Sequence, residues 1–374
     1  FLKIPCIPSK HWGWSCIVIG VGCLRQFRSK IRFRNYKKRK NKNLVGVSLV
    51  ERTRMAKELE RFRNYEHIKA PANFSLINNT EEMLRFIAAL NRAFEKHRKV
   101  YVKLHKLKSM TDDAIVLLLS NVLEFKNAKI DFNGSRPYDV SIARRLEKSG
   151  FFDILYGKRK NAYWNKGESF SINKDKSMYT HATKNVDSEL TSELIENSAE
   201  YLWGEKRRCR GVQRIFLELM QNTNNHASRH PGEKYWWVNI SLLNNPKRIG
   251  FSFIDYGMGI FTSLNTKGTN TKFYNWIDKI RNLCNPEEHH EVLRLMMLGD
   301  FHNTVTGHPY RGKGIPGIYN EISKGAITKL VIISNDAYAN TQDNDYRKLR
   351  HSLKGTFVYW ELDASCKNLP LYNE

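Results

Sequence analysis

A predicted β-strand that ends in a carboxylate and two closely spaced glycines constrains the fold most tightly. Arg248–Ile254 (RIGFSFI) has the apolar pattern of a strand, and Asp255-Tyr256-Gly257-Met258-Gly259-Ile260 follows it directly. Two glycines let the backbone turn sharply beside a flat ligand, and the Asp255 carboxylate can accept a hydrogen bond from an exocyclic amine. An ordinary strand-to-loop turn also favours Asp and Gly, so the motif is weak alone.

A predicted helix carries a second polar motif. In 212–227 (VQRIFLELMQNTNNHA), Glu218, Asn222 and His226 recur every four residues and therefore form one strip along the helix. A carboxamide oxygen can bind Mg²⁺, and a carboxylate can take a proton from an attacking water. The alternative is a solvated helix face.

A third motif is the glycine-rich loop 311–318 (RGKGIPGI), which is predicted to lead into a helix through Tyr319 and Ile322. Closely spaced glycines let backbone N–H groups converge on phosphate oxygens, a helix N-terminus adds a favourable dipole, and Lys313 adds charge. The spacing is not that of a Walker A loop. When this motif is taken alone, the alternative to a phosphate-binding loop is an ordinary flexible glycine loop.

The order and spacing of the three motifs resemble the N, G1 and G2 boxes of the GHKL (gyrase and histidine kinase-like) ATPase superfamily. The resemblance extends over residues 190–362, with a late hairpin expected around Gly355-Thr356-Phe357. It implies a Bergerat-type α/β sandwich with a mixed sheet, which binds ATP with Mg²⁺.

The resemblance also implies a role for each matching residue. Glu218 is expected to be the general base, Asn222 the Mg²⁺ ligand and Asp255 the acceptor of the adenine amine. The other expected nucleotide-binding residues are Gly257, Gly259, Ile260, Gly312, Lys313, Gly314, Ile315, Gly317 and Thr356. His226 matches a motif position, but a packing or polar contact is its expected role.

The stretch 261–310 between the glycine boxes is longer than the lid of a typical histidine kinase. An extra helix is predicted there, over 287–298. A sensor kinase would need a phosphoacceptor histidine before the ATP-binding domain, usually in a His-Glu-x-x-x-Pro motif on a dimerisation helix, and no such motif is found upstream. His290-Glu291 lies within the lid and lacks the expected proline, so histidine autophosphorylation is disfavoured.

The first half of the chain predicts a small βαβα block. Residues 55–98 have helical apolar spacing, with a stripe of Met83, Phe86, Ile87 and Leu90. Strands are predicted over 99–104 and 129–132, a helix over 114–125, a turn at Asn133-Gly134, and a helix ending near residue 149. The block 99–152 resembles a STAS-type layer, which implies partner switching with GHKL serine kinases.

The STAS-like block offers Ser109 and Thr111 near a predicted helix start. The resemblance implies that one of these hydroxyls can be phosphorylated. The plainer interpretation is that Thr111 with Asp112 caps the helix. The predicted organisation is a basic tail (1–54), a STAS-like α/β domain (55–155), a polar linker (156–187) and a GHKL-type domain (188–374). The expected fold class is α/β, of the α+β kind.

Charge is concentrated at the start of the chain. The formal net charge is +25, and residues 1–54 hold fourteen basic residues and one acid, or +13 of that total. Such a tail suggests nucleic acid or another anionic partner, although a solvated tail or an extension foreign to the native protein is the plainer interpretation.

Other features favour a cytoplasmic protein. The apolar run 12–24 is too short to span a membrane, and no small-residue cleavage site follows it. Six scattered cysteines predict a reducing compartment. The spacing of Cys6, His11, Cys16 and Cys23 matches no common zinc pattern.

The sequence therefore predicts an ATP-binding protein, either a Mg²⁺-dependent ATPase or an ATP-driven regulatory switch. The alternatives are a partner-switching regulator with serine/threonine kinase activity, and a nucleic-acid-associated module that uses ATP as a switching ligand. A protein partner or self-association through the lid or the STAS-like domain is also expected.

Overall fold

The computed structural model describes residues 57, 60–149, 151–152, 178–182, 188–226, 236–262, 285, 287–298 and 314–366. The chain divides into two compact units, Phe1–Arg63 and Asn64–Glu374. The fold below is that of the second unit, and it belongs to the α+β class. The Cys6, His11, Cys16 and Cys23 set and the basic tail lie outside the described residues.

The N-terminal part of this unit is an α/β layer. Its three parallel strands lie in the order β1-β3-β5, and a short parallel pair, β2-β4, lies apart from them. The elements are β1 (Glu66–Lys69), β2 (Asn73–Phe74), α3 (Thr80–Glu95), β3 (Val100–Lys103), β4 (Ser109–Met110), α4 (Asp112–Asn127), β5 (Phe132–Gly134) and α5 (Val140–Lys148).

Two secondary-structure predictions for this layer are wrong in part. Within 64–98 only α3 is a regular helix, and Glu66–Lys69 is a strand that pairs with β3. The spacing of apolar residues within 55–98 does not reveal this pairing, because the partner strand lies outside that segment. The strand expected over 129–132 begins at Phe132. Lys129 has a φ of 57°, and Ile130 N–H donates to the Phe125 carbonyl, which ends α4 with a left-handed turn.

The helix starts of this layer use different caps. The Asp139 carboxylate accepts the Ser141 and Ile142 N–H groups at the start of α5. Thr111 precedes α4 but makes no side-chain cap; its hydroxyl donates instead to the Phe74 carbonyl at 3.3 Å. Asn133 and Gly134, predicted as a turn, lie in β5.

The second layer is a five-stranded sheet in the order β6-β7-β8-β10-β9. All four of its strand pairings are antiparallel, whereas we expected a mixed sheet. Short reversals between β7 and β8 and between β9 and β10 produce hairpins, which can only be antiparallel. Its strands are β6 (Met178–Ala182), β7 (Trp236–Leu243), β8 (Arg248–Asp255), β9 (Lys329–Asn340) and β10 (Asp345–Asp363). Strand β6 lies within the segment expected to be a polar linker.

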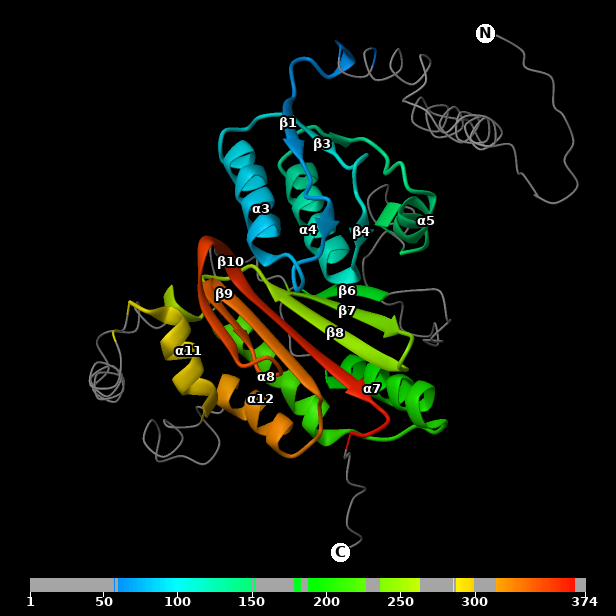
Figure 1. Ribbon diagram of the computed structural model, residues 1–374, viewed down its shortest axis with the longest axis vertical. Helices are drawn as coiled ribbons and strands as arrows, with labels where there is room; N and C mark the ends of the chain where they lie inside the picture. The colour runs from blue at the N-terminus through cyan, green and yellow to red at the C-terminus, as the bar shows by residue number, and fades with distance from the viewer. Residues whose placement is uncertain are drawn as a thin grey trace, which may run out of the picture. The chain divides into compact units, whose positions relative to one another are not determined.

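Helices form the third layer, on one face of this sheet (Figure 1). Alternate strand residues supply its core: the Phe251 and Trp360 rings stack with centroids 5.4 Å apart, and Phe216 of the helical layer meets Trp360 edge-on at 4.8 Å. The helices are α7 (Ser188–Trp203), α8 (Arg210–His226), α11 (His289–Leu298) and α12 (Gly314–Ser323). No helix in the described part of the chain is both long and apolar enough to cross a membrane.

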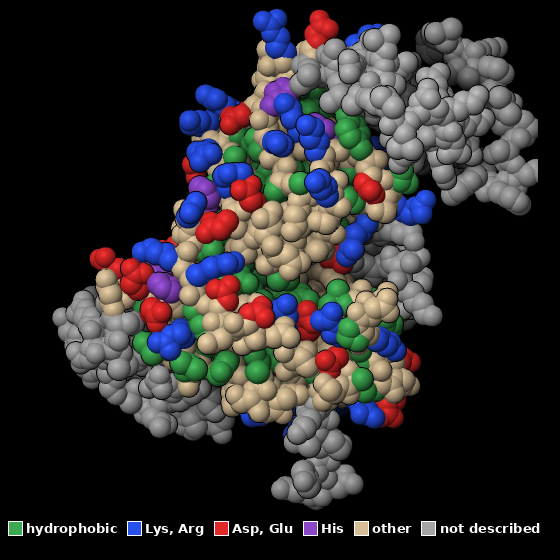
Figure 2. Space-filling model, in the orientation of Figure 1, with side chains coloured by type: hydrophobic (Ala, Val, Ile, Leu, Met, Phe, Trp, Pro, Cys, Tyr) green, Lys and Arg blue, Asp and Glu red, His purple; other side chains and the backbone are tan. Residues whose placement is uncertain are grey.

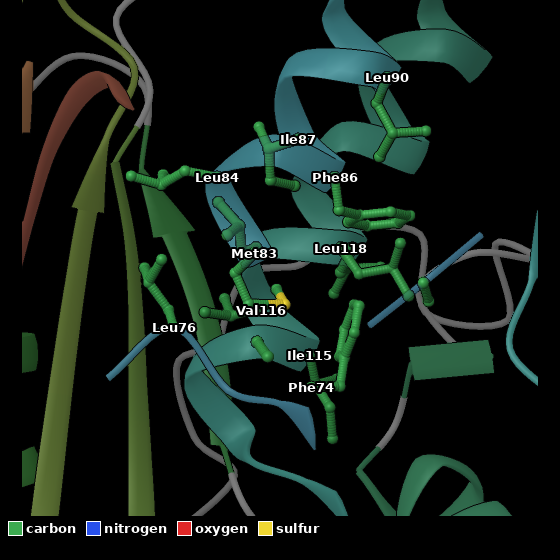
Figure 3. Close-up of a cluster of buried hydrophobic side chains, with 14 of the residues drawn as sticks. Phe74, Leu76, Met83, Leu84, Phe86, Ile87, Leu90, Ile115, Val116 and Leu118 are labelled. Carbon is green, nitrogen blue, oxygen red and sulfur yellow. The ribbon is translucent and has the colours of Figure 1, made fainter. Parts of the chain in front are cut away.

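The opposite face of the sheet packs on the α/β layer. Trp237, Ile254 and Phe357 belong to the same buried cluster as the inner faces of α3 and α4. Figure 3 shows Phe86 and Leu118 between the two helices, while Leu84 points toward the strands of the sheet. The α/β layer and the antiparallel sheet therefore share one hydrophobic core.

This shared core predicts cooperative unfolding. Leu84 is fully buried, so Leu84→Ala should lower the free energy of unfolding by about 2–4 kcal/mol. Residues 64–152 contain no tryptophan, yet the tryptophan-fluorescence transition should move together with the far-UV circular dichroism transition. Lys96→Gln, an exposed change in the same layer, is the control. An unmoved fluorescence transition in Leu84→Ala would contradict the shared core.

Candidate functional site

Four residues form a row across the antiparallel sheet. In register, Trp236 lies opposite Asp255, Asp255 opposite Thr356, and Thr356 opposite Ser334. Side chains alternate along a strand, so Asp255 lies on the same face as Phe253, two residues earlier, which packs under the helices. The row therefore places a carboxylate and two hydroxyls between the sheet and the helical layer.

Asp255 is the buried charge of this row, with 9% of its surface exposed. Burial raises the pKa of its carboxyl from 3.8 to about 6, while hydrogen bonds from the Gly257 N–H and from Thr356 oppose the rise. The Gly257 N–H lies 2.9 Å from Asp255 Oδ1. No ion pair with Asp255 occurs among the described residues, and its carboxylate can accept a further hydrogen bond from a ligand donor.

The glycine turn after Asp255 is held by two residues in the middle of β9. Ser334 Oγ accepts the Ile260 N–H at 2.9 Å, and the Asn335 side chain donates to the Met258 carbonyl at 3.0 Å. Asn335 Oδ1 also accepts the Phe261 N–H at 3.1 Å. These two polar residues were missed from the sequence; the only signal was a polar pair ending the apolar run of β9.

Gly259 has the backbone conformation that the sequence motif requires. Its φ is +77°, and a Cβ there would lie 2.4 Å from Asn335 Oδ1. Between Asp255 and this turn, Tyr256 points the other way, and its hydroxyl hydrogen-bonds with Ser120 of α4. The turn thus contacts both sides of the sheet.

Gly355 brings β10 against the end of β8. Its φ is +116°, and a Cβ would lie 1.9 Å from the Asp255 carbonyl oxygen. The late hairpin expected around Gly355 is that of β9 and β10, but its turn is at 341–344. Gly355 lies inside the long strand β10, between Leu353 and Thr356, where the register with β9 shifts. Ser334 Oγ donates to the Gly355 carbonyl at 3.1 Å and lies 3.2 Å from Thr356 Oγ1, which fixes Thr356 beside Asp255.

Glu218 and Asn222 lie on α8, whose predicted apolar face is buried. Both side chains are partly exposed. Near the start of α8, Arg214 Nη1 lies 3.8 Å from Glu321 Oε1 near the end of α12, so the two helices run in opposite directions. The half of α8 that holds Glu218 and Asn222 therefore lies beside the beginning of α12.

The beginning of α12 lies toward the polar row. Only residues 324–328 join α12 to β9, so helix and strand run in opposite directions, and the helix start lies beside the part of β9 beyond its first residues, toward Ser334. Gly314 is the first residue of α12, and Ile315 and Gly317 are buried. The topology thus brings the beginning of α12, the polar strip of α8 and the row to one end of the fold.

Some expected site residues cannot be placed. Gly312 and Lys313 lie outside the described residues, as does the side chain of His226. Within the described residues, no hydrogen bond or ion pair joins Glu218 or Asn222 to Asp255. The structure therefore places the residues around Asp255 but not the loop that precedes α12.

The helix expected in the long lid is α11, which begins at His289 rather than at residue 287. Its His289 ring stacks on Phe261 with centroids 4.4 Å apart and an interplanar angle of 11°. His289 Nδ1 also contacts Asp336 Oδ1. This helix is therefore fixed to the residue that follows the glycine turn.

The close approach at Gly355 predicts a stability difference between two glycines. Gly204 also has a positive φ, of +81°, but a Cβ there would meet nothing within 4 Å. Gly204→Ala should cost about 1 kcal/mol of backbone strain, whereas Gly355→Ala should cost several times more, because it also collides with the backbone of Asp255. Urea unfolding measures both values, and equal losses would contradict the predicted contact.

The raised pKa of Asp255 predicts a pH-dependent cost. Between pH 3.8 and about 6, the Asp255 carboxyl binds a proton in the folded protein that it has lost in the unfolded chain. The stability contributed by Asp255 is therefore lost as pH rises through this window. Asp255→Asn should then be more stable than wild type at pH 7.5, by at most ~3 kcal/mol, and the difference should shrink toward pH 4.

Asp131 supplies the control of opposite sign for this measurement. Hydrogen bonds from Lys99 and Tyr65 lower the pKa of its carboxyl, so Asp131→Asn should lose stability above pH 4. Urea unfolding at several pH values gives both differences. A gain for Asp255→Asn that is the same at pH 4 and pH 7.5 would show that its carboxylate is not the cause.

Comparison with known proteins assigns no family. A scan against protein-family models finds no match, and a search of curated proteins finds no significant match. The chemistry of the site is therefore inferred from its own residues.

Proposed function

We propose that this chain binds ATP with Mg²⁺ and hydrolyses it, as a histidine kinase-like ATPase of the GHKL type. The main support is the buried Asp255 carboxylate beside Thr356 and the glycine turn, at the end of the fold where α8 and α12 converge. A buried carboxylate can accept a hydrogen bond from an exocyclic amine, and an adenine base offers one.

In this proposal the sheet holds the base. Asp255 accepts a hydrogen bond from the exocyclic amine of adenine, and Thr356, its register partner, supports the same edge of the ring. Gly257 lets the flat base approach the backbone, Gly259 allows the positive-φ turn against Asn335, and Ile260 packs against the base. Ser334 and Asn335 keep the turn in place before the nucleotide arrives.

The beginning of α12 receives the phosphates. Backbone N–H groups at a helix start are free to donate, and the helix dipole favours negative charge there. Gly314, Ile315 and Gly317 supply this part of the site, and Gly312 and Lys313 would extend it from the preceding loop. The glycines among these residues let phosphate oxygens come close to the backbone.

The polar strip of α8 performs the chemistry. Residues four apart on a helix lie about 6 Å from each other, so Glu218 and Asn222 can serve one reacting centre. The Asn222 oxygen would hold Mg²⁺, which would neutralise phosphate charge. Glu218, partly exposed, would take the proton of the attacking water.

A γ-phosphate assay tests the proposed reaction. With γ-³²P-ATP, Glu218→Gln should lower release of free phosphate at least 100-fold and leave ATP affinity within about threefold, because the base acts in the chemical step. Glu200→Gln, on the exposed face of the neighbouring helix α7, is the matched control and should behave as wild type.

The same assay separates the competing functions. Label that accumulates on protein rather than as free phosphate would favour kinase activity over hydrolysis. Unchanged turnover in Glu218→Gln would show that Glu218 is not the base. Unchanged ATP affinity in Asp255→Asn would remove the basis of the whole proposal, since that residue is expected to recognise the base.

A further inference from the structure

A group of basic side chains lies at one edge of the small parallel sheet, apart from the proposed ATP site. Lys69 ends β1 and Lys103 ends β3, and the two are register partners on adjacent parallel strands. His105 and Lys106 follow in the next loop. We call Lys69, Lys103, His105 and Lys106 the carboxyl-edge cluster, because the strands end at this edge.

The backbone beneath the cluster is braced by the segment after β5. Ser135 Oγ accepts the Leu104 and His105 N–H groups at 2.9 and 3.1 Å. Tyr138 N–H donates to the His105 carbonyl at 3.1 Å, and the two rings lie 5.2 Å apart. The segment after β5 therefore holds the backbone of His105 in place, next to the lysines of the cluster.

The lysines of the cluster lack acidic partners. In the described part of the chain, Lys69, Lys103 and Lys106 form no ion pair. The opposite edge of the same sheet differs: Arg98 lies 3.5 Å from Glu66, and Lys99 lies 2.9 Å from Asp131. Positive charge is thus compensated at one edge of this sheet and left uncompensated at the other.

Acids near the cluster are already engaged. Asp139 accepts two N–H groups at the start of α5, and Glu147 pairs with Arg136.

Burial lowers the pKa of the His105 ring, and the charges of Lys106, Lys103 and Lys69 lower it further. All three lysines are therefore close enough to repel a charge on this ring. Figure 2 shows Lys and Arg side chains scattered over the visible face of the α/β layer.

We propose that the carboxyl-edge cluster binds the phosphate group of a small ligand. Open α/β sheets bind ligands beyond the carboxyl ends of their parallel strands, which is where the cluster lies. Lysine ammonium groups act as point charges for phosphate, and a protonated His105 would add a donor. The cluster spans two neighbouring strands about 5 Å apart, so it matches one phosphate group better than an extended polyanion.

Titration with inorganic phosphate tests this proposal. The pKa of His105 is followed by NMR as phosphate is added at constant ionic strength, with chloride as the balancing anion. Bound phosphate offsets the three lysines, so the pKa of His105 should rise and approach its ordinary value. The double variant Lys103→Gln/Lys106→Gln should weaken phosphate binding at least tenfold.

Matched variants separate this cluster from the rest of the molecule. Lys96→Gln, which is exposed in the same layer, should leave phosphate binding unchanged. If the double variant does not fold, Lys69→Gln tests the same cluster from β1. Asp255→Asn should also leave the response intact, so a failure of the ATP proposal does not affect this one.

Three results would overturn the proposal. The first is an equal response of His105 to chloride and to phosphate, which would mean simple screening. The second is unchanged phosphate binding in the lysine variants. The third is a response to a single-stranded oligonucleotide but none to inorganic phosphate, which would identify a nucleic-acid surface instead.

Discussion

Both faces of the antiparallel sheet are covered, and the alternation of side chains along each strand divides them between two cores. Phe251, Phe253 and Trp360 pack under the helices, whereas Ile254 and Phe357 pack against the α/β layer. A shift of one residue in register would send each set to the wrong side. Burial on both faces therefore fixes the register, and the register aligns the polar row of the candidate site.

The polar row illustrates how a stable frame holds an unfavourable group. Burial of the Asp255 carboxylate costs free energy, and the hydrogen bonds from Gly257 and Thr356 recover only part of it. Two apolar cores and the contacts of Ser334 and Asn335 hold this arrangement together. Such a residual cost at one position is typical of sites prepared for a ligand.

Tyr256 connects the two halves of the unit at the same place. Its neighbours Asp255 and Gly257 belong to the candidate site, while its own hydroxyl reaches Ser120 on α4 of the α/β layer. A change in α4 would therefore act directly on the glycine turn. This contact offers a physical route by which the α/β layer and the proposed ATP site could influence each other.

The sequence by itself determined the local features. The helical strip of Glu218 and Asn222, the strand that ends at Asp255, the helix in the lid and the α+β class all follow from periodicity and glycine chemistry, which act over a few residues. Strand Glu66–Lys69 and the continuity of β10 through Gly355 did not, because each depends on a partner strand far along the chain.

Tertiary structure alone decided which polar groups meet. Ser334 and Asn335 support the glycine turn, and Lys69 joins Lys103 beside His105, only because strand pairing brings distant segments together. It also decided that the α/β layer and the antiparallel sheet share one core rather than forming two separate domains. The physical reason is the same in each case: pairing and burial are properties of surfaces that the chain creates only when it folds.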